Sequence, residues 1–155
     1  FDELEYLNIG VLDMKGKSRV INIPNDRKQV WQQIENVLRN PVIRRFVLRE
    51  DKKLEKKAGI SALCEYSLLS DNVYPTYAVT KKELKDSGVK VEKQVSELEE
   101  IGCVVLELGY FIDFLGKGFQ DPLSVVLSFT GEEQEEERVD ISINEMLEEY
   151  VWSKD

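Results

Sequence analysis

The reactive side chains of this chain do not form a recognisable catalytic pattern. None of the 155 residues is a histidine, so general acid–base chemistry would fall to Asp, Glu, Lys or Tyr. The carboxylates are numerous, but none stands in a recognisable pair on an apolar run. Gly116-Lys117-Gly118 lacks both the Walker and the Rossmann spacing, and no serine occupies a Gly-x-Ser-x-Gly elbow. The sequence therefore predicts a protein that is not an enzyme, with no catalytic residue and no cofactor.

The two cysteines, Cys64 and Cys103, offer little metal or redox chemistry. Without histidine a His-containing zinc site is excluded, and two thiols are too few for a four-cysteine site. Consecutive glutamates in the run 132–137 rarely converge on one ion, so no metal is predicted. We expect both cysteines to be reduced residues in or near the core of a cytoplasmic protein. A single disulfide between them is the alternative.

Three cations, Lys15, Lys17 and Arg19, cluster around a glycine-containing turn between two short β-rich segments. The net charge of −9 is unevenly spread, because residues 1–57 carry +4 and residues 58–155 carry −13. An acidic body does not attract phosphates over its whole surface. If the protein contacts nucleic acid, we expect these three residues to make the contact. The alternative is a solvated hairpin that carries cations without a ligand.

Length and composition are those of one ordinary globular domain with a small appendage. Hydrophobic residues make up 42% of the chain and charged residues 33%. No apolar run approaches the ~18 residues that a membrane span requires, and no signal peptide is visible. Because the first residue is Phe1, we expect the sequence to be a fragment of a longer protein.

The first 48 residues read as helix end, hairpin, helix and strand. Residues 1–9 show helical spacing, and Gly10 stands where that helix would stop. Residues 11–14 and 19–23 then form a β-hairpin. An amphipathic helix follows over 26–39, Pro41 ends it, and residues 42–48 form a strand.

The remaining residues predict further helices around a small sheet. Helices are expected over 58–69, over 81–86 after an N-cap at Thr80, from Pro122 after an N-cap at Asp121, and over 139–152. Strands are expected over 76–79 and 103–110, the latter central because it is a continuous apolar run. Residues 89–100 fit either a strand or a loop, and residues 131–137 read as an acidic connector. The predicted fold class is α+β: a partial winged helix over 1–24, then a mixed domain over 25–155 with a small sheet and about five helices.

A second set of residues fits a partner or ligand role less directly. These are Arg44, Arg45, Gly59, Ser61, Tyr66, Tyr77 and Asp121. The two arginines would form a basic strand edge or a solvated face. Gly59 and Ser61 fit close helix packing at least as well as a ligand site. An apolar pocket lined by the aromatic residues Trp31, Tyr66, Tyr77 and Tyr110 is a further alternative, although such residues usually belong to the core.

Four strings in this order resemble a known family: Leu38-Arg39-Asn40-Pro41-Val42-Ile43-Arg44-Arg45, Ala58-Gly59-Ile60-Ser61-Ala62-Leu63 with Tyr66, Pro75-Thr76-Tyr77-Ala78-Val79-Thr80, and Asp121-Pro122-Leu123-Ser124. Together they resemble bacterial winged-helix transcriptional regulators whose second domain is related to abortive-infection (type IV) antitoxins. The resemblance spans residues 38–152. It implies that residues 4–23 are the end of a recognition helix and its wing. It also implies a repressor without enzymatic activity, whose second domain senses or binds a partner.

Three functions follow as hypotheses. The first is a DNA-binding transcriptional regulator, with the wing on phosphates, a helix-turn-helix upstream of Phe1 and a homodimer matched to a two-fold operator. The second is an antitoxin-like interaction module whose acidic C-terminal helix binds a basic partner such as a toxin. The third is a small-ligand sensor built on the aromatic pocket. An upstream helix-turn-helix in the gene favours the first, and a neighbouring nucleotidyltransferase-like gene favours the second.

Overall fold

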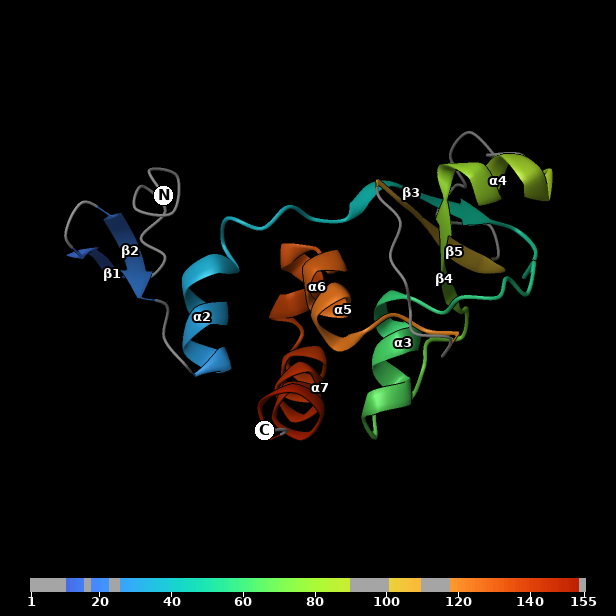
Figure 1. The fold of residues 1–155 in the computed structure, drawn as a ribbon. Helices are drawn as coiled ribbons and strands as arrows, with labels where there is room; N and C mark the ends of the chain where they lie inside the picture. Colours follow the sequence, from blue (N-terminus) through green and yellow to red (C-terminus); the bar gives the residue numbers. More distant parts are fainter. Residues whose placement is uncertain (1–10, 16–17, 23–25, 90–100, 110–117, 154–155) are drawn as a thin grey trace. The chain divides into compact units, whose positions relative to one another are not determined.

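The computed structural model describes residues 11–15, 18–22, 26–89, 101–109 and 118–153. The chain divides into two compact units, residues 1–39 and residues 40–155 (Figure 1). The helix expected over 1–9 lies outside the described residues.

Within its described residues, the first unit contains the predicted hairpin and one helix. Strands β1 (Val11–Lys15) and β2 (Ser18–Asn22) pair antiparallel, with residues 16 and 17 between them. Helix α2 (Arg27–Ile34) begins at the N-cap Asp26, whose side chain accepts a hydrogen bond from the Lys28 amide. It ends five residues before the predicted end at 39. The Val37 amide donates to the Ile34 carbonyl over 2.9 Å, a bond that spans three residues as in a 3₁₀ turn and closes the end of the helix. In addition, Pro41 disfavours helical backbone at the residue before it, Asn40.

The second unit is built on a mixed three-stranded sheet. Its strands are β3 (Val42–Leu48), β4 (Thr76–Thr80) and β5 (Cys103–Leu108), in the order β3-β5-β4. Strand β5 pairs antiparallel with β3 and parallel with β4, and all six of its residues are buried. The prediction of a central strand in this run is confirmed, because only a strand covered on both faces needs a continuous apolar sequence.

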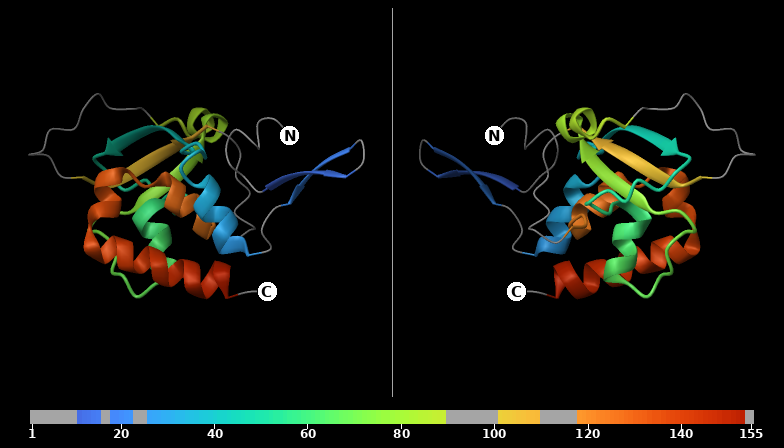
Figure 2. Two further views of the ribbon diagram at one scale, coloured as in Figure 1. Left: turned by 90° about the vertical axis from the view of Figure 1, so that its left-hand side faces the viewer. Right: turned by 90° about the vertical axis from the view of Figure 1, so that its right-hand side faces the viewer.

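Helices cover both faces of the sheet (Figure 2). On one face, Leu84 of α4 (Lys81–Ser87) packs in a cluster with Phe46, Val79 and Val105. The opposite face carries Ala78 and Leu106, next to the start of α3 (Gly59–Tyr66). Helices α5 (Pro122–Ser128) and α7 (Glu137–Leu147) pack against α3 and complete that layer.

Close packing at the start of α3 explains its small residues. Gly59 has a φ of +53°, and a Cβ at this position would lie 3.3 Å from Cγ2 of Thr76. Ser61 and Ala62 are buried beside it. The expectation of tight helix packing is confirmed, although the helix ends at Tyr66 and not at Leu69.

The expectation of an acidic connector over residues 131–137 is wrong over most of its length. Residues Gly131–Glu135 form the short helix α6. Thr130 accepts a hydrogen bond from the Glu133 amide, and Glu133 in turn accepts one from the Thr130 amide, which makes a capping box. Helix α7 then begins at Glu137, and its last turn continues as the π-helical segment η1 (Glu148–Trp152).

The predicted fold class, α+β, is confirmed. Within the described residues the chain has six α-helices, the π-helical segment, the three-stranded mixed sheet and the separate hairpin. The structure groups α2 with the hairpin, whereas the sequence places the functional division after residue 24. The assignment of the hairpin to a winged helix stays a prediction.

Candidate functional site

The hairpin brings its basic residues to one end of a two-stranded ribbon. Lys15 is opposite Ser18, and Arg19 is opposite Met14, so both cations lie within two residues of the turn. Lys17 lies outside the described residues. A narrow ribbon with positive charge at its tip is a shape that fits beside a nucleic-acid backbone or into a groove.

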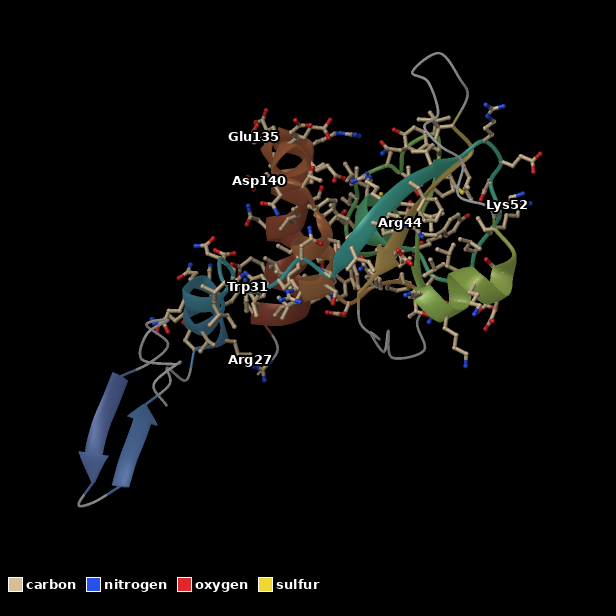
Figure 3. The ribbon with its side chains drawn as sticks, turned by 90° about the horizontal axis from the view of Figure 1, so that it is seen from above. Arg27, Trp31, Arg44, Lys52, Glu135 and Asp140 are labelled. Carbon is tan, nitrogen blue, oxygen red and sulfur yellow. The ribbon has the colours of Figure 1, made fainter. Side chains whose placement is uncertain are left out.

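Arg44 and Arg45 hold parts of the second unit together instead of forming a basic edge. Arg44 Nε donates to Glu107 Oε2 over 3.1 Å, from directly across the β3–β5 ladder, and its guanidinium lies 5.5 Å from the ring centre of Phe46. The Glu107 side chain is only 8% exposed, so this pair compensates a charge buried in the sheet. Figure 3 labels Arg44 on β3.

Arg45, the next residue, points to the opposite face of the sheet. Its Nη1 atom donates to Glu133 Oε1 of α6 over 2.6 Å, and Nη2 donates to Oε2 over 3.4 Å. Burial alone would raise the pKa of Glu133, but the bonds from Arg45 and Thr130 outweigh it and lower that pKa. Arg45 therefore fixes α6 against β3.

Three of the other candidate residues meet around a residue that the sequence did not indicate, Gln120. Gln120 is fully buried and precedes α5. Its Oε1 atom accepts from the Gly59 amide over 3.1 Å, and its Nε2 atom donates to Ser128 Oγ over 3.0 Å. Its carbonyl accepts from the Tyr66 hydroxyl over 2.7 Å. Asp121, the next residue, caps α5 by accepting from the Ser124 amide. We call this set the Gln120 hub.

The polar groups of the Gln120 hub have hydrogen-bond partners within the fold. Burial raises the pKa of Tyr66 to about 12, with Asp121 and Tyr150 adding to the effect, so the phenol stays protonated and donates. The backbone amide of Gln120 also donates to the Lys57 carbonyl over 3.0 Å. Because these buried polar atoms are paired with one another, the hub joins α3, α5 and the loop before α5 and has a structural role.

Ser61 and Tyr77 also have partners within the fold. Ser61 Oγ donates to Asp71 over 3.0 Å and accepts from the Thr76 amide over 2.8 Å, which ties α3 to β4. The Tyr77 hydroxyl donates to Asp51 over 2.8 Å, and burial together with that bond raises the pKa of Tyr77 to about 12.

Of the four aromatic residues, the two that the structure describes in the second unit, Tyr66 and Tyr77, do not line one cavity. Tyr77 belongs to the cluster under α4, whereas Tyr66 lies edge-on to Phe119 and Tyr150 at ring-centre distances of 5.2 Å and 5.1 Å. Trp31 is a buried residue of the first unit, and Tyr110 lies outside the described residues. The two tyrosines that the structure describes therefore line different parts of the second unit.

Both cysteines are free thiols, as expected, and both are poor nucleophiles. Burial raises the pKa of Cys64 to about 11, and the carboxylates of Asp71 and Glu65 add to the shift. Burial also raises the pKa of Cys103, which is in the core of β5. Because the thiolate is the reactive form, neither residue has the environment of a catalytic or redox-sensing cysteine.

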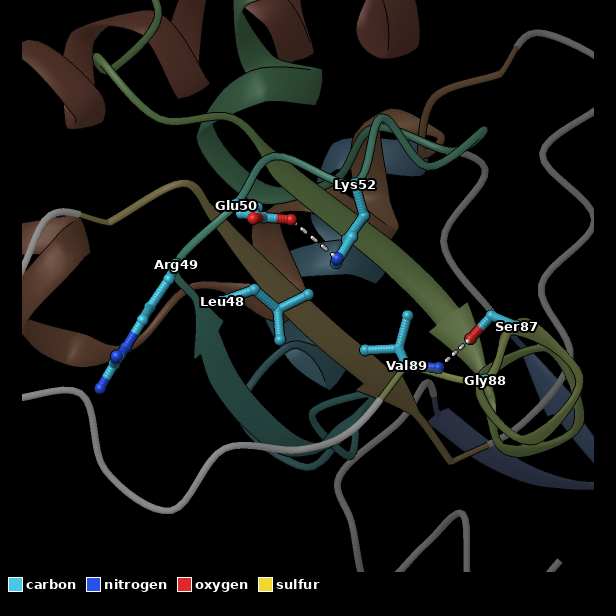
Figure 4. Close-up of a pocket in the computed structure, with 7 residues that line it drawn as sticks. All are labelled: Leu48, Arg49, Glu50, Lys52, Ser87, Gly88 and Val89. Carbon is cyan, nitrogen blue, oxygen red and sulfur yellow. Dashed lines mark hydrogen bonds and ion pairs between the residues drawn. The ribbon is translucent and has the colours of Figure 1, made fainter.

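One hollow of about 450 Å³ lies where β3 ends beside the end of α4 (Figure 4). Its lining includes Lys52, whose ammonium pairs with Glu50 at 3.1 Å, and Ser87, whose Oγ accepts from the Val89 amide. The close-up draws these two pairs, so Glu50, Lys52 and Ser87 already have partners within the lining.

A larger, open groove of about 700 Å³ lies between the end of α3 and the C-terminal helix. We call it the acidic groove because four of its eight lining residues are glutamates. The lining residues are Glu65, Tyr66, Ser67, Leu68, Glu145, Glu148, Glu149 and Tyr150. Its lining residues from the C-terminal helix belong to the most acidic stretch of the chain, because residues 130–155 hold ten carboxylates and two cationic side chains.

Two searches of the described residues for other kinds of site give negative results. They contain no group of three or more Cys, Asp or Glu side chains placed to hold a metal ion. Among the same residues, no helix has both the length and the apolar character needed to cross a membrane.

Comparison with known proteins does not place the chain in a family. No protein-family model, no curated protein and no solved structure matches it.

Proposed function

We propose that this protein is a DNA-binding transcriptional regulator in which the β1–β2 hairpin contacts phosphates and the acidic second unit serves a partner. The proposal rests on one observation: Lys15 and Arg19 lie at the connected ends of the paired strands β1 and β2, in a different compact unit from the acidic one. A hairpin wing with cations at its tip positions a protein on a duplex through backbone contacts that do not read the sequence.

The distribution of charge supports this division of labour. The second unit carries a net charge of −9, with 15 Lys and Arg against 24 Asp and Glu, and the first unit is neutral overall. Within the first unit the hairpin is locally positive, because Asp13 is the only acid between Val11 and Ile23. A duplex is therefore attracted to the hairpin and repelled by most of the remaining surface.

The test is Lys17→Glu in the full-length protein, measured by fluorescence anisotropy with duplexes of different sequence. A phosphate contact contributes to binding regardless of sequence, so the affinity for all duplexes falls by a similar factor. Lys82→Glu, the same charge change at an exposed residue of α4, is the matched control and leaves the affinities much less affected. Equal affinity of Lys17→Glu and the parent protein for every duplex contradicts the proposal.

A second candidate function, an interaction module of the antitoxin type, is favoured by the acidic groove. Its lining combines carboxylates with a fully exposed leucine, Leu68, and two tyrosines, a composition suited to a basic protein partner. The two functions are compatible, because the hairpin and the groove belong to different units.

A further inference from the structure

The acidic groove has an apolar side that the fold does not use. Leu68 is 98% exposed and Val73, farther along the same loop, is fully exposed. Ile141 is half exposed on α7 and shares a helix face with Glu145, four residues on. The loop runs along α7, since Arg138 Nη2 donates to Asn72 Oδ1 over 3.3 Å. Exposed apolar side chains gathered between charged ones are typical of protein-binding surfaces.

The charged side of the groove determines the sign of its partner. Glu145 and Glu149 are exposed carboxylates of the C-terminal helix, and Glu65 faces them from α3, where it pairs with Lys57 at 2.8 Å. The surrounding residues 130–155 have a net charge of −8. Such a surface repels nucleic acid and anionic lipid headgroups, and it attracts a cationic protein segment.

The two tyrosines that line the groove are held by contacts within the fold. Tyr66 is held by its hydrogen bond to the Gln120 carbonyl and by its edge-on contact with Tyr150. Tyr150 belongs to η1, and π-helical turns of this kind often occur at functional sites. Side chains that are already held lose less freedom on binding, which lowers the entropic cost of association.

We propose that the acidic groove, together with Leu68, Val73 and Ile141, binds an amphipathic cationic helix of a partner protein. The apolar face of that helix covers the three exposed side chains, and its Lys and Arg residues meet Glu145 and Glu149. This is the helix-in-groove mode of recognition, in which apolar anchors recur every three or four residues. The proposal deepens the partner-binding part of the proposed function and does not depend on DNA binding by the hairpin.

The test uses synthetic peptides as probes of the full-length protein. The first is an 18-residue Leu/Lys peptide with leucines at helical spacing, and the second has the same composition in a scrambled order. Binding is followed by anisotropy of a peptide-borne fluorophore at physiological salt, with no DNA present. The amphipathic peptide is expected to bind at least tenfold more tightly than the scrambled one.

Two double variants locate the binding. Glu145→Lys with Glu149→Lys weakens binding of the amphipathic peptide at least tenfold. Glu135→Lys with Asp140→Lys makes the same charge change on α6 and α7 outside the groove and is expected to weaken it less than threefold (Figure 3 labels both positions). Leu68→Ser, which alters no charge, is expected to reduce the preference for the amphipathic peptide.

Equal binding of the two peptides, or equal losses in the two double variants, overturns the proposal, because either result means non-specific attraction between opposite charges. Thermal unfolding of each variant checks that the fold is intact. Since no nucleic acid is present, failure here leaves the hairpin proposal standing, and failure of the duplex-binding test leaves this one standing.

Discussion

The Gln120 hub and the acidic groove share Tyr66, but the polar side chains of the hub are buried and hydrogen-bonded, whereas the glutamates of the groove are exposed. In the hub, the side chains of Gln120 and Ser128 are buried and hydrogen-bonded to each other, and the Tyr66 hydroxyl donates to the Gln120 carbonyl. In the groove, Glu145 and Glu149 face solvent beside the exposed Leu68. The buried groups are needed for stability, because an unpaired polar atom in the interior is costly. The exposed groups contribute little to stability, so their arrangement is available for binding.

The largest effect is expected from Gln120→Leu. This change leaves the buried Gly59 amide without the side-chain oxygen that it donates to, and it removes one of the two bonds of Ser128 Oγ, which still donates to the Ser124 carbonyl. It costs about 2–4 kcal/mol of the free energy of unfolding. Urea denaturation measures the loss. The matched control is Gln134→Leu, whose exposed side chain donates one hydrogen bond to the Val126 carbonyl. If the two variants lose similar stability, the hub is not the structural element described above.

The next effect is expected from Arg44→Met, which leaves Glu107 buried without its cation. Because Arg44 is half exposed and water can reach Glu107 after relaxation, we expect a loss of about 1–2 kcal/mol. Adding Glu107→Leu to Arg44→Met should recover most of that loss in a double-mutant cycle. A double variant less stable than Arg44→Met alone would show that Glu107 has another role in the sheet.

A smaller effect, dependent on pH, is expected at Glu133. Its pKa is lower in the folded protein than the ordinary value of 4.5. The charged carboxylate therefore contributes stability that is fully present above pH 4.5 and is lost as pH falls through the folded pKa. Glu133→Gln should cost about 1 kcal/mol near pH 6, and the difference from the parent protein should shrink towards pH 3.

The measurement at Glu133 is urea unfolding between pH 3 and pH 6. Glu132→Gln, at an exposed position in the same helical turn, serves as the control and should shift stability by less than about half as much. A loss for Glu133→Gln that does not change with pH would contradict the charge-assisted bond from Arg45.

The smallest effect on stability is expected within the groove. Leu68→Ser removes an apolar side chain that is already in water, so the free energy of unfolding should change by less than about 0.5 kcal/mol. Leu63→Ala, at a fully buried position of α3, should cost about 2–5 kcal/mol in the same assay. A large loss for Leu68→Ser would show that Leu68 packs in the folded protein, and the contrast between hub and groove would fail.

Local signals predicted much of the fold from the sequence. The caps at Thr80 and Asp121 were predicted, because an N-cap depends on residues within four positions of it. The central position of β5 followed from its apolar run. Helix α6 was not predicted, although Thr130 and Glu133 have the same spacing as Thr80 and Glu83, because a run of glutamates is also typical of an exposed connector.

The contacts that define the two sites were not predictable in the same way. The hydrogen bonds of Gln120 join it to Gly59 and Tyr66, 61 and 54 residues away, and nothing local distinguishes this glutamine from an exposed one. The sequence does mark Glu107, because it is the only charged residue within the apolar run 103–108. That Arg44 is its partner follows only from the register of β3 on β5. The groove likewise depends on the packing of α3 against α7.

The most direct test of the central claim is the salt dependence of binding to a random-sequence duplex by the full-length protein. Replacing Lys15, Lys17 and Arg19 with alanine should reduce the slope of log K against log salt by about 2–3, since each phosphate contact contributes about 0.9. Glu145→Gln with Glu149→Gln should leave that slope unchanged. A hairpin variant that binds with the parent slope would contradict the assignment of the hairpin to phosphate contact.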